Sequence, residues 1–209
     1  MNDLINFHYG NVEETCAHPY LWPVLQREIA ALRLDDRRAF DVGCGNGATA
    51  NILTQMGFDV TGIDPSEIGV GLATKAFPKI HAHVGSAYDD LRGTYGTFPL
   101  VISLEVIEHC FFPKKFARTC FDLLADNGVL ILSTPYHGYL KNVALSVLGR
   151  WDLHANPFWE GGHIKFFSRR MMTELLANTG FVNVSYIRVG RIPPLAKSII
   201  VIAHKRPFT

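Results

Sequence analysis

Apolar residues recur along the chain in two alternating patterns. Short and nearly continuous apolar runs predict strands at residues 38–42, 59–63, 80–84, 100–104 and 128–135. Apolar residues at helical spacing predict helices at residues 19–32, 48–56, 66–77 and 113–125. Continuous apolar runs suit strands that are covered on both faces, so the pattern predicts an α/β fold with a doubly wound, mostly parallel sheet.

The pattern changes after residue 135. Residues 136–167 are rich in aromatic residues, glycine and histidine, with a short predicted helix around residues 143–148. A helix at 168–179 and strands at 181–189 and 198–203 follow, and the short link between these strands predicts that they are antiparallel. Because no repeat or linker interrupts the chain, we expect a single domain over residues 1–209, with 136–167 as an insertion over the working edge of the sheet.

Composition narrows the possible partners and the location. The chain has 20 Lys and Arg against 19 Asp and Glu, which disfavours nucleic acid or an anionic membrane and favours a small-molecule partner. The four cysteines form no C-x-x-C pair, so a reducing, cytoplasmic location is the expectation. The sequence shows no signal-peptide pattern and no window as long as a membrane span, and it does not indicate an oligomeric state.

A glycine-rich loop, F-D-V-G-C-G-N-G-A, occupies residues 40–48 between the first predicted strand and the following helix. A parallel sheet binds its ligand at such a position, although a dinucleotide-binding loop has similar glycine spacing. Asp41 ends the strand, where a carboxylate would oppose a pyrophosphate but pair with a cationic amino-acid head group. Asp64 ends the next strand and is placed to bond ribose hydroxyls in either kind of cofactor. Asp41 therefore favours an adenosylmethionine over a dinucleotide.

This loop, together with I-D-P-S and L-V-I-S-L-E-V-I-E-H in the same order and spacing, resembles the class I S-adenosylmethionine-dependent methyltransferases from residue 38 to the C-terminus. The resemblance implies a seven-stranded sheet with an antiparallel last strand and S-adenosylmethionine as the cofactor. It places Asp41 near the ammonium and Asp64 on the ribose. Ser86 stands where an acidic residue often bonds the adenine amine. The predicted cofactor-binding residues are Asp41, Gly43, Cys44, Gly45, Gly47, Asp64, Pro65, Ser86, Ala87 and Leu104.

The segment E-V-I-E-H carries the candidate chemistry on the acceptor side. On a helical turn, the spacing i, i+3, i+4 would bring Glu105, Glu108 and His109 to one face. Methyl transfer to a hydroxyl requires alignment and loss of a proton, and a divalent metal would assist both. With His163, the motif resembles the metal site of ubiquinone-pathway catechol O-methyltransferases and of small-RNA terminal 2′-O-methyltransferases. Mixed carboxylate and imidazole ligands favour a transition metal, and magnesium stays open.

A metal-free hypothesis stands beside this one. In that case Glu105 orients the substrate, or His109 acts as general base, and these two residues are the predicted catalytic pair. Trp151 and Trp159, in the aromatic insertion, are the predicted substrate contacts, although packing within the insertion would explain them equally well.

The sequence thus predicts a methyltransferase that transfers a methyl group to the oxygen of a small molecule such as a catechol, a quinol precursor, a sugar or another diol. Two alternatives remain: an RNA 2′-O-methyltransferase, for which Lys165, Arg169 and Arg170 would supply positive charge, and a non-catalytic module that only binds S-adenosylmethionine. Transfer to nitrogen or carbon also stays open.

Overall fold

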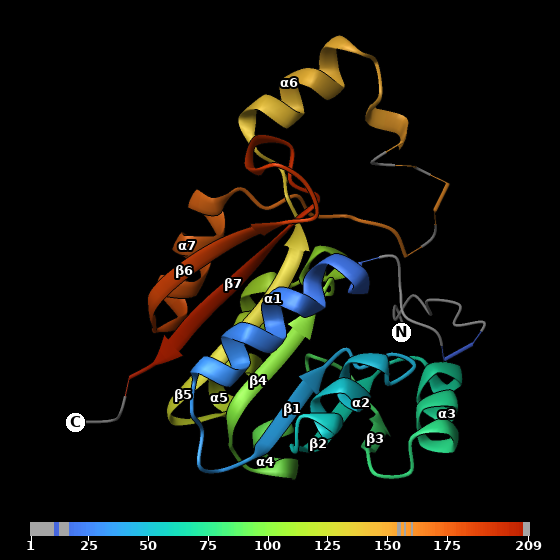
Figure 1. The fold of residues 1–209 in the computed structure, drawn as a ribbon, viewed down its shortest axis with the longest axis vertical. Helices are drawn as coiled ribbons and strands as arrows, with labels where there is room; N and C mark the ends of the chain where they lie inside the picture. Colours follow the sequence, from blue (N-terminus) through green and yellow to red (C-terminus); the bar gives the residue numbers. More distant parts are fainter. Residues whose placement is uncertain (1–10, 13–16, 154–155, 157, 160, 207–209) are drawn as a thin grey trace.

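One seven-stranded sheet organises the molecule (Figure 1). The computed structural model describes residues 11–12, 17–153, 156, 158–159 and 161–206. The strands are β1 (Arg38–Val42), β2 (Asp59–Asp64), β3 (His81–Val84), β4 (Phe98–Leu104), β5 (Leu124–Pro135), β6 (Phe181–Val189) and β7 (Ser198–Lys205). The α-helices are α1 (His18–Ala31), α2 (Ala48–Gln55), α3 (Glu67–Ala76), α4 (Leu91–Tyr95), α5 (Pro113–Leu123), α6 (Tyr139–Val147) and α7 (Arg169–Thr179), and the short 3₁₀ helices are η1 (Ile107–His109), η2 (Trp151–Leu153) and η3 (Pro193–Leu195).

The strand order is β3-β2-β1-β4-β5-β7-β6. Strands β1 to β5 pair in parallel, whereas β7 runs antiparallel to both β5 and β6. The predicted doubly wound sheet with an antiparallel last strand is therefore confirmed. The order reverses beside β1, and a parallel sheet opens a crevice at the carboxyl ends of the strands where its order reverses.

Apolar side chains on both faces of the sheet explain the continuous apolar runs. In β4, Leu100 and Ile102 join the core beneath α1 and α2, while Val101 joins the core beneath α5 and α7. All three are fully buried, and burying such a side chain stabilises the fold by about 1.5–3 kcal/mol. The helices on each face thus fix the strand ends that surround the crevice.

Helix α4 and the start of strand β5 differ from the sequence prediction. Helix α4 was not predicted, because its five residues are too few to show a helical period; Asp90 caps it by accepting a hydrogen bond from the Gly93 N–H at 3.0 Å. Strand β5 begins at Leu124, directly after α5, because Leu124 pairs with Phe98 on β4 ahead of a register shift. Neither difference moves the carboxyl ends of the strands.

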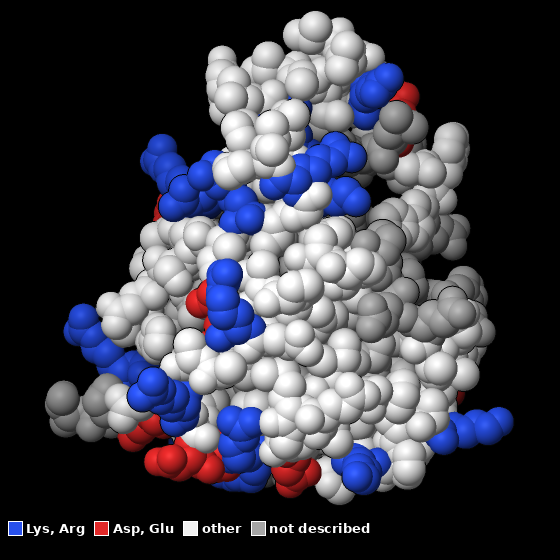
Figure 2. Space-filling view, in the orientation of Figure 1, with Lys and Arg blue, Asp and Glu red and all other residues white. Residues whose placement is uncertain are grey.

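Helix α6 stands apart from the sheet (Figure 1), and none of its residues is buried. Figure 2 shows basic side chains gathered in a band just below α6, while the visible acidic side chains lie mainly at the opposite end of that face. The net charge of +1 therefore conceals an uneven distribution. Among the described residues, no helix combines the length and the apolar character needed to cross a membrane.

Candidate functional site

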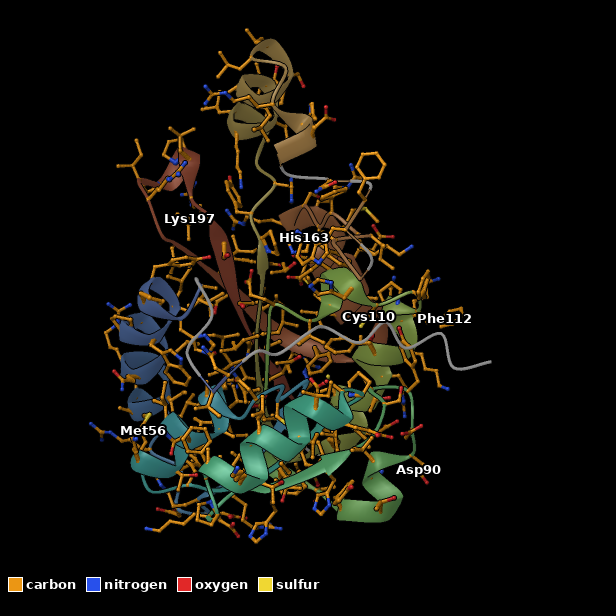
Figure 3. The ribbon with its side chains drawn as sticks, turned by 90° about the vertical axis from the view of Figure 1, so that its right-hand side faces the viewer. Met56, Asp90, Cys110, Phe112, His163 and Lys197 are labelled. Atoms are coloured by element: carbon orange, nitrogen blue, oxygen red, sulfur yellow. The ribbon has the colours of Figure 1, made fainter. Side chains whose placement is uncertain are left out.

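A cavity of about 330 Å³ lies at the carboxyl ends of β1, β2 and β4. Two of its residues are labelled in Figure 3: His163, between η2 and α7, and Cys110, directly after η1. The described residues that line it are Ala17, His18, Leu21, Gly43, Cys44, Gly45, Asn46, Thr49, Ile63, Asp64, Pro65, Ser86, Ala87, Tyr88, Leu104, Glu105, Val106, His109, Cys110, Phe111, Trp159, Gly161, Gly162, His163 and Ile164.

The glycine loop forms one wall of the cavity. The N–H groups of Gly43 and Cys44 both donate to the Ile63 carbonyl, at 2.8 and 2.9 Å, which ties the loop to the end of β2. Gly43 has a φ of +85°, and a Cβ there would lie 2.5 Å from a methyl carbon of Val106. Only glycine fits this conformation and this close approach.

Asp64 connects the loop to the cavity. Its Oδ2 accepts a hydrogen bond from the Gly45 N–H at 2.9 Å, and its Oδ1 accepts one from the Ser66 N–H at 2.8 Å. Burial raises the pKa of Asp64, and these two hydrogen bonds oppose the rise. Each carboxylate oxygen keeps a further lone pair, so Asp64 can still accept hydrogen bonds from the two hydroxyls of a ribose.

Asp41 lies behind the loop and is not part of the cavity wall. It is 1% exposed, and its Oδ2 has no hydrogen-bond partner among the described residues. Burial, and secondarily the charge of Asp64, raises the pKa of Asp41 to about 8. A buried acid of this kind stays protonated unless a cation approaches it. Because Asp41 lies outside the cavity wall, its contact with the ammonium stays a prediction.

Most of the remaining predicted cofactor residues line the cavity wall, as Asp64 does, and one lies outside it, as Asp41 does. Ser86 lies in the wall, but its hydroxyl already accepts a hydrogen bond from the Tyr88 N–H at 3.1 Å. The structure places Gly43, Cys44, Gly45, Asp64, Pro65, Ser86, Ala87 and Leu104 in the wall, whereas Asp41 and Gly47 support the loop from outside it.

The helical turn at the end of β4 is shorter than the sequence predicts. It begins at Ile107, while Glu105 precedes it with a φ of +55°, a backbone conformation that costs a non-glycine residue about 1–3 kcal/mol and is concentrated at functional sites. The Glu105 carboxylate accepts hydrogen bonds from the hydroxyls of Ser133 at 2.7 Å and Ser198 at 3.3 Å. Glu105 therefore does not share the face that carries Glu108 and His109, contrary to the expected spacing, although it still lines the cavity.

Hydrogen bonds hold residues 161–165 against η1. The backbone N–H groups of Ile164 and Lys165 both donate to the Glu108 carbonyl at 3.0 Å. The Nδ1 of His109 lies 2.6 Å from the Gly161 carbonyl oxygen and 3.1 Å from that of Gly162. Because carbonyls only accept, Nδ1 carries the proton and Nε2 has a lone pair for a metal or a proton.

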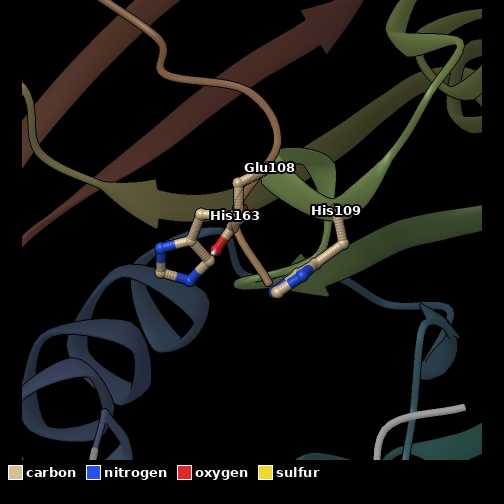
Figure 4. Close-up of side chains that lie close together, drawn as sticks. All are labelled: Glu108, His109 and His163. Atoms are coloured by element: carbon tan, nitrogen blue, oxygen red, sulfur yellow. Dashed lines mark ion pairs between the residues drawn. The ribbon is translucent and has the colours of Figure 1, made fainter. Parts of the chain in front are cut away.

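Glu108, His109 and His163 form a compact group of possible metal ligands (Figure 4). Each offers one ligand atom, and these atoms lie within 4.8 Å of one another. The Nε2 of His163 is 4.0 Å from Oε1 of Glu108, and the rings of His109 and His163 are 5.0 Å apart. Three of the four predicted metal ligands thus come together, from segments more than fifty residues apart in the sequence.

The electrostatics of this group favour a cation. Glu108 is fully buried, and among the described residues neither of its carboxylate oxygens has a hydrogen-bond partner. Burial and then the charge of Glu105 raise the pKa of Glu108 well above its ordinary value. The nearby Glu108 backbone and Thr134 hydroxyl oppose this rise, although neither forms a hydrogen bond with the carboxylate in this geometry. Burial also lowers the pKa of His109, which favours the neutral ring that a metal requires.

Comparisons with known proteins now identify the family. A family model described as a methyltransferase domain matches residues 18–186. The chain belongs to this methyltransferase family. The ubiquinone biosynthesis O-methyltransferase of Caulobacter sp. strain K31 is 34% identical over 132 residues, which are 59% of this chain and 52% of the relative. That of Psychrobacter arcticus is 32% identical over 172 residues, which are 77% and 65% of the two chains. The chain spans about half to two thirds of these curated relatives.

A solved structure shows the same fold. The magnesium protoporphyrin IX methyltransferase of Synechocystis PCC 6803, crystallised with bound SAH, has a TM-score of 0.65 and 21% identity, covering 88% of this chain and 80% of that one. The predicted resemblance to S-adenosylmethionine-dependent methyltransferases is confirmed at the level of family and fold.

The structure separates the two predicted substrate contacts of this methyltransferase. Trp159 lines the cavity, with its ring 5.9 Å from that of His109 and 5.2 Å from that of His163. Trp151 instead donates from Nε1 to the Ser146 hydroxyl at 2.9 Å and is not in the wall. Two further histidines belong to residues 136–167. His137 packs against Phe166 outside the wall, and His154 lies outside the described residues.

Sequence reasoning missed the contribution of α1 to the methyltransferase cavity. Ala17, His18 and Leu21 line it beside the glycine loop, although they lie 19 or more residues before residue 40, where that loop begins. Helical periodicity predicted the helix, but nothing in the pattern indicated that its first turn would reach the ligand. The sequence also did not predict that Tyr88 and Phe111 line the cavity. An isolated aromatic residue belongs to no motif that would indicate where its side chain lies.

Because the carboxyl of Asp41 is buried, we expect its replacement by an amide to affect the stability of the fold and the binding of S-adenosylmethionine in opposite directions. In the unfolded chain its carboxyl ionises near the ordinary value of 3.8, but in the folded protein only near 8. Between about pH 3.8 and pH 8, the folded state therefore binds one more proton than the unfolded chain. The free energy of unfolding of the ligand-free protein consequently falls as pH rises through this range. We expect ligand-free Asp41→Asn to be at least as stable as wild type at pH 8, while its affinity for S-adenosylmethionine falls about tenfold or more.

Thermal unfolding from pH 5 to 8.5 and calorimetric titration measure the two effects. The matched control is Asp59→Asn, an exposed aspartate at the start of β2, which should change neither. A less stable Asp41→Asn variant with unchanged affinity would contradict the assigned role.

Proposed function

We propose that this chain is an S-adenosylmethionine-dependent O-methyltransferase that acts on a small molecule with two neighbouring hydroxyls, with a divalent metal held by Glu108, His109 and His163. The observation that carries the proposal is the ligand group of these three residues, within 4.8 Å of one another, in and beside the same cavity as the glycine loop. The curated relatives named above are O-methyltransferases by name, which supports oxygen as the methyl acceptor.

The residues fit a metal ion. A fully buried carboxylate without hydrogen bonds is costly, and a bound cation would compensate that cost. The carbonyls of Gly161 and Gly162 accept hydrogen bonds from Nδ1 of His109 and so fix the tautomer and the orientation of its ring. Histidines that bind metals are commonly oriented by such a hydrogen bond from the ring nitrogen that does not bind the metal. One carboxylate and two imidazoles leave coordination positions for two substrate oxygens.

The residues also fit S-adenosylmethionine. The glycine loop lets the cofactor approach the backbone closely, and Asp64 presents two oxygens suited to a ribose. The sheet order places the ends of β2 and β3 on one side of β1 and the end of β4 on the other. An adenosyl group against Asp64 and Ser86 would therefore direct the methyl group towards Glu105, His109 and His163.

On the acceptor side, the chain's own groups align the substrate and receive a proton. A divalent metal, when bound, lowers the pKa of a coordinated hydroxyl and fixes its position. Trp159 and Phe111 supply apolar and aromatic surface beside the ligand group and would exclude water from the reacting oxygen. Glu105 is held in the wall by Ser133 and Ser198, outside the three-residue group, and we assign it to accept the hydroxyl proton.

The substrate class can be tested with a matched pair of acceptors. We expect the wild-type protein to methylate catechol with Mn²⁺ present, and to methylate phenol at least about a hundredfold more slowly, because phenol offers only one oxygen to the metal. Removal of metal with a chelator should abolish the difference by stopping turnover of catechol. Product formation is measured by mass spectrometry; equal rates on the two acceptors, or full activity after chelation, would rule out chelation of a diol.

Metal binding can be measured without turnover. Elemental analysis of untagged protein and titration of Mn²⁺, Zn²⁺ and Mg²⁺ should show one equivalent bound in wild type. His163→Ala should weaken binding about tenfold to a hundredfold. His81→Ala, which removes an exposed histidine on β3, should leave it unchanged. If His163→Ala and His81→Ala bind metal alike, the ligand group is wrongly assigned.

Glu105→Gln separates proton transfer from binding. The amide can still contact Ser133 and Ser198, because a hydroxyl both donates and accepts. We expect kcat on catechol to fall about a hundredfold to ten-thousandfold, while metal stoichiometry and S-adenosylmethionine affinity stay as in wild type. Unchanged kcat would exclude Glu105 as the base, and loss of the metal would make it a ligand instead.

A further inference from the structure

The cavity contains no arginine or lysine to meet the negative end of its cofactor. All 20 Lys and Arg residues lie within the described part of the chain, and none lines the cavity. The wall does carry carboxylates, at Asp64 and Glu105. The carboxylate of S-adenosylmethionine therefore needs a partner of another type, and among the described wall residues only histidines can carry positive charge.

Among the described residues, three histidines line the cavity: His18, His109 and His163. His109 and His163 belong to the proposed metal group at the acceptor end. His18 lies instead at the start of α1, against the side of the cavity that contains Asn46 and Thr49 of the loop and α2. Of these three described histidines, His18 is the one that lies away from the acceptor end.

The shape of the cofactor leads to the same residue. A sulfonium carries three substituents, and the methyl group must point to the acceptor while the adenosyl group meets the ends of β2 and β3. The amino-acid arm must then follow the glycine loop towards α1. We infer that His18, together with Thr49, binds the carboxylate of this arm; the inference rests on the proposed cofactor.

The local geometry supports this role. The Nε2 of His18 lies 3.1 Å from the Thr49 hydroxyl, and the imidazole stacks on Trp22 with an interplanar angle of 15°. Both His18 and Thr49 are 7% exposed, so the pair is held in place and shielded from water. A hydrogen bond to a carboxylate is stronger in such surroundings than at the surface.

The position of His18 in its helix adds to the effect. It is the first residue of α1, a helix of 14 residues, whose amino end carries partial positive charge. No acidic residue occupies the first turn. The imidazole, the Thr49 hydroxyl and the helix end would together provide a positive potential for the carboxylate. Among the described residues, no lysine or arginine lines the cavity to provide it.

The test compares two ligands that differ only in the carboxylate: S-adenosylmethionine and its decarboxylated form. We expect wild type to bind S-adenosylmethionine about tenfold or more tightly than the decarboxylated ligand. His18→Ala and His18→Gln should each weaken binding of S-adenosylmethionine about tenfold to a hundredfold and change binding of the decarboxylated ligand by less than about twofold. The glutamine variant keeps a side chain that can contact Thr49, which guards against loss of the fold.

Calorimetric titration gives both affinities, and His204→Ala, which alters a histidine on β7 outside the cavity wall, is the control and should bind both ligands as wild type does. A loss confined to S-adenosylmethionine supports the inference. An equal loss for both ligands shows that His18 only supports the fold, and no loss shows that the carboxylate lies elsewhere; either result overturns the inference. If wild type binds neither ligand, the proposed cofactor fails first.

Discussion

The site depends on a small set of hydrogen bonds between η1 and residues 161–165. Two backbone N–H groups donate to the Glu108 carbonyl, and Nδ1 of His109 donates to the carbonyls of Gly161 and Gly162. These contacts bring His163 beside the end of β4, orient the ring of His109 and place Trp159 in the cavity wall. Without them, the glycine loop would still line the cavity, but the proposed acceptor side would lack His163, its third proposed metal ligand, and the aromatic ring of Trp159.

Buried carboxyl groups give the site its second constraint. Asp41, Asp64, Glu105 and Glu108 are all raised in pKa, and burial is the largest cause for each. Evolution rarely keeps such groups unless a ligand stabilises their charged forms, because they weaken the ligand-free fold. The proposed cofactor, with its sulfonium and its ammonium, and the proposed divalent ion would supply that compensation. The same excess of negative charge explains why the carboxylate of the cofactor requires a dedicated partner at His18.

Much of the architecture was predictable from the sequence, because it follows from local patterns. Continuous apolar strands covered by helices on both faces define the doubly wound sheet, and the spacing of glycines and aspartates marks its ligand edge. The conformation of Glu105 was not predictable. Glu105 has a positive φ and is hydrogen-bonded to the hydroxyls of Ser133 and Ser198 on two other strands, and contacts between such distant residues leave no local pattern. The role inferred for His18 depends likewise on a contact between distant segments, for which residue type and spacing give no signal. Trp159 was predicted, but residue type could not distinguish it from Trp151, which lies outside the cavity wall.

The most direct test of this account is a crystal structure of the protein with S-adenosylhomocysteine and Mn²⁺, with diffraction data collected at the manganese absorption edge. We predict an anomalous peak bounded by Glu108, His109 and His163, and the cofactor along the glycine loop with its sulfur facing that peak. A well-ordered cofactor without a peak between these residues would contradict the metal site, and a cofactor whose sulfur faces away from Glu105 and His109 would contradict the proposed direction of methyl transfer.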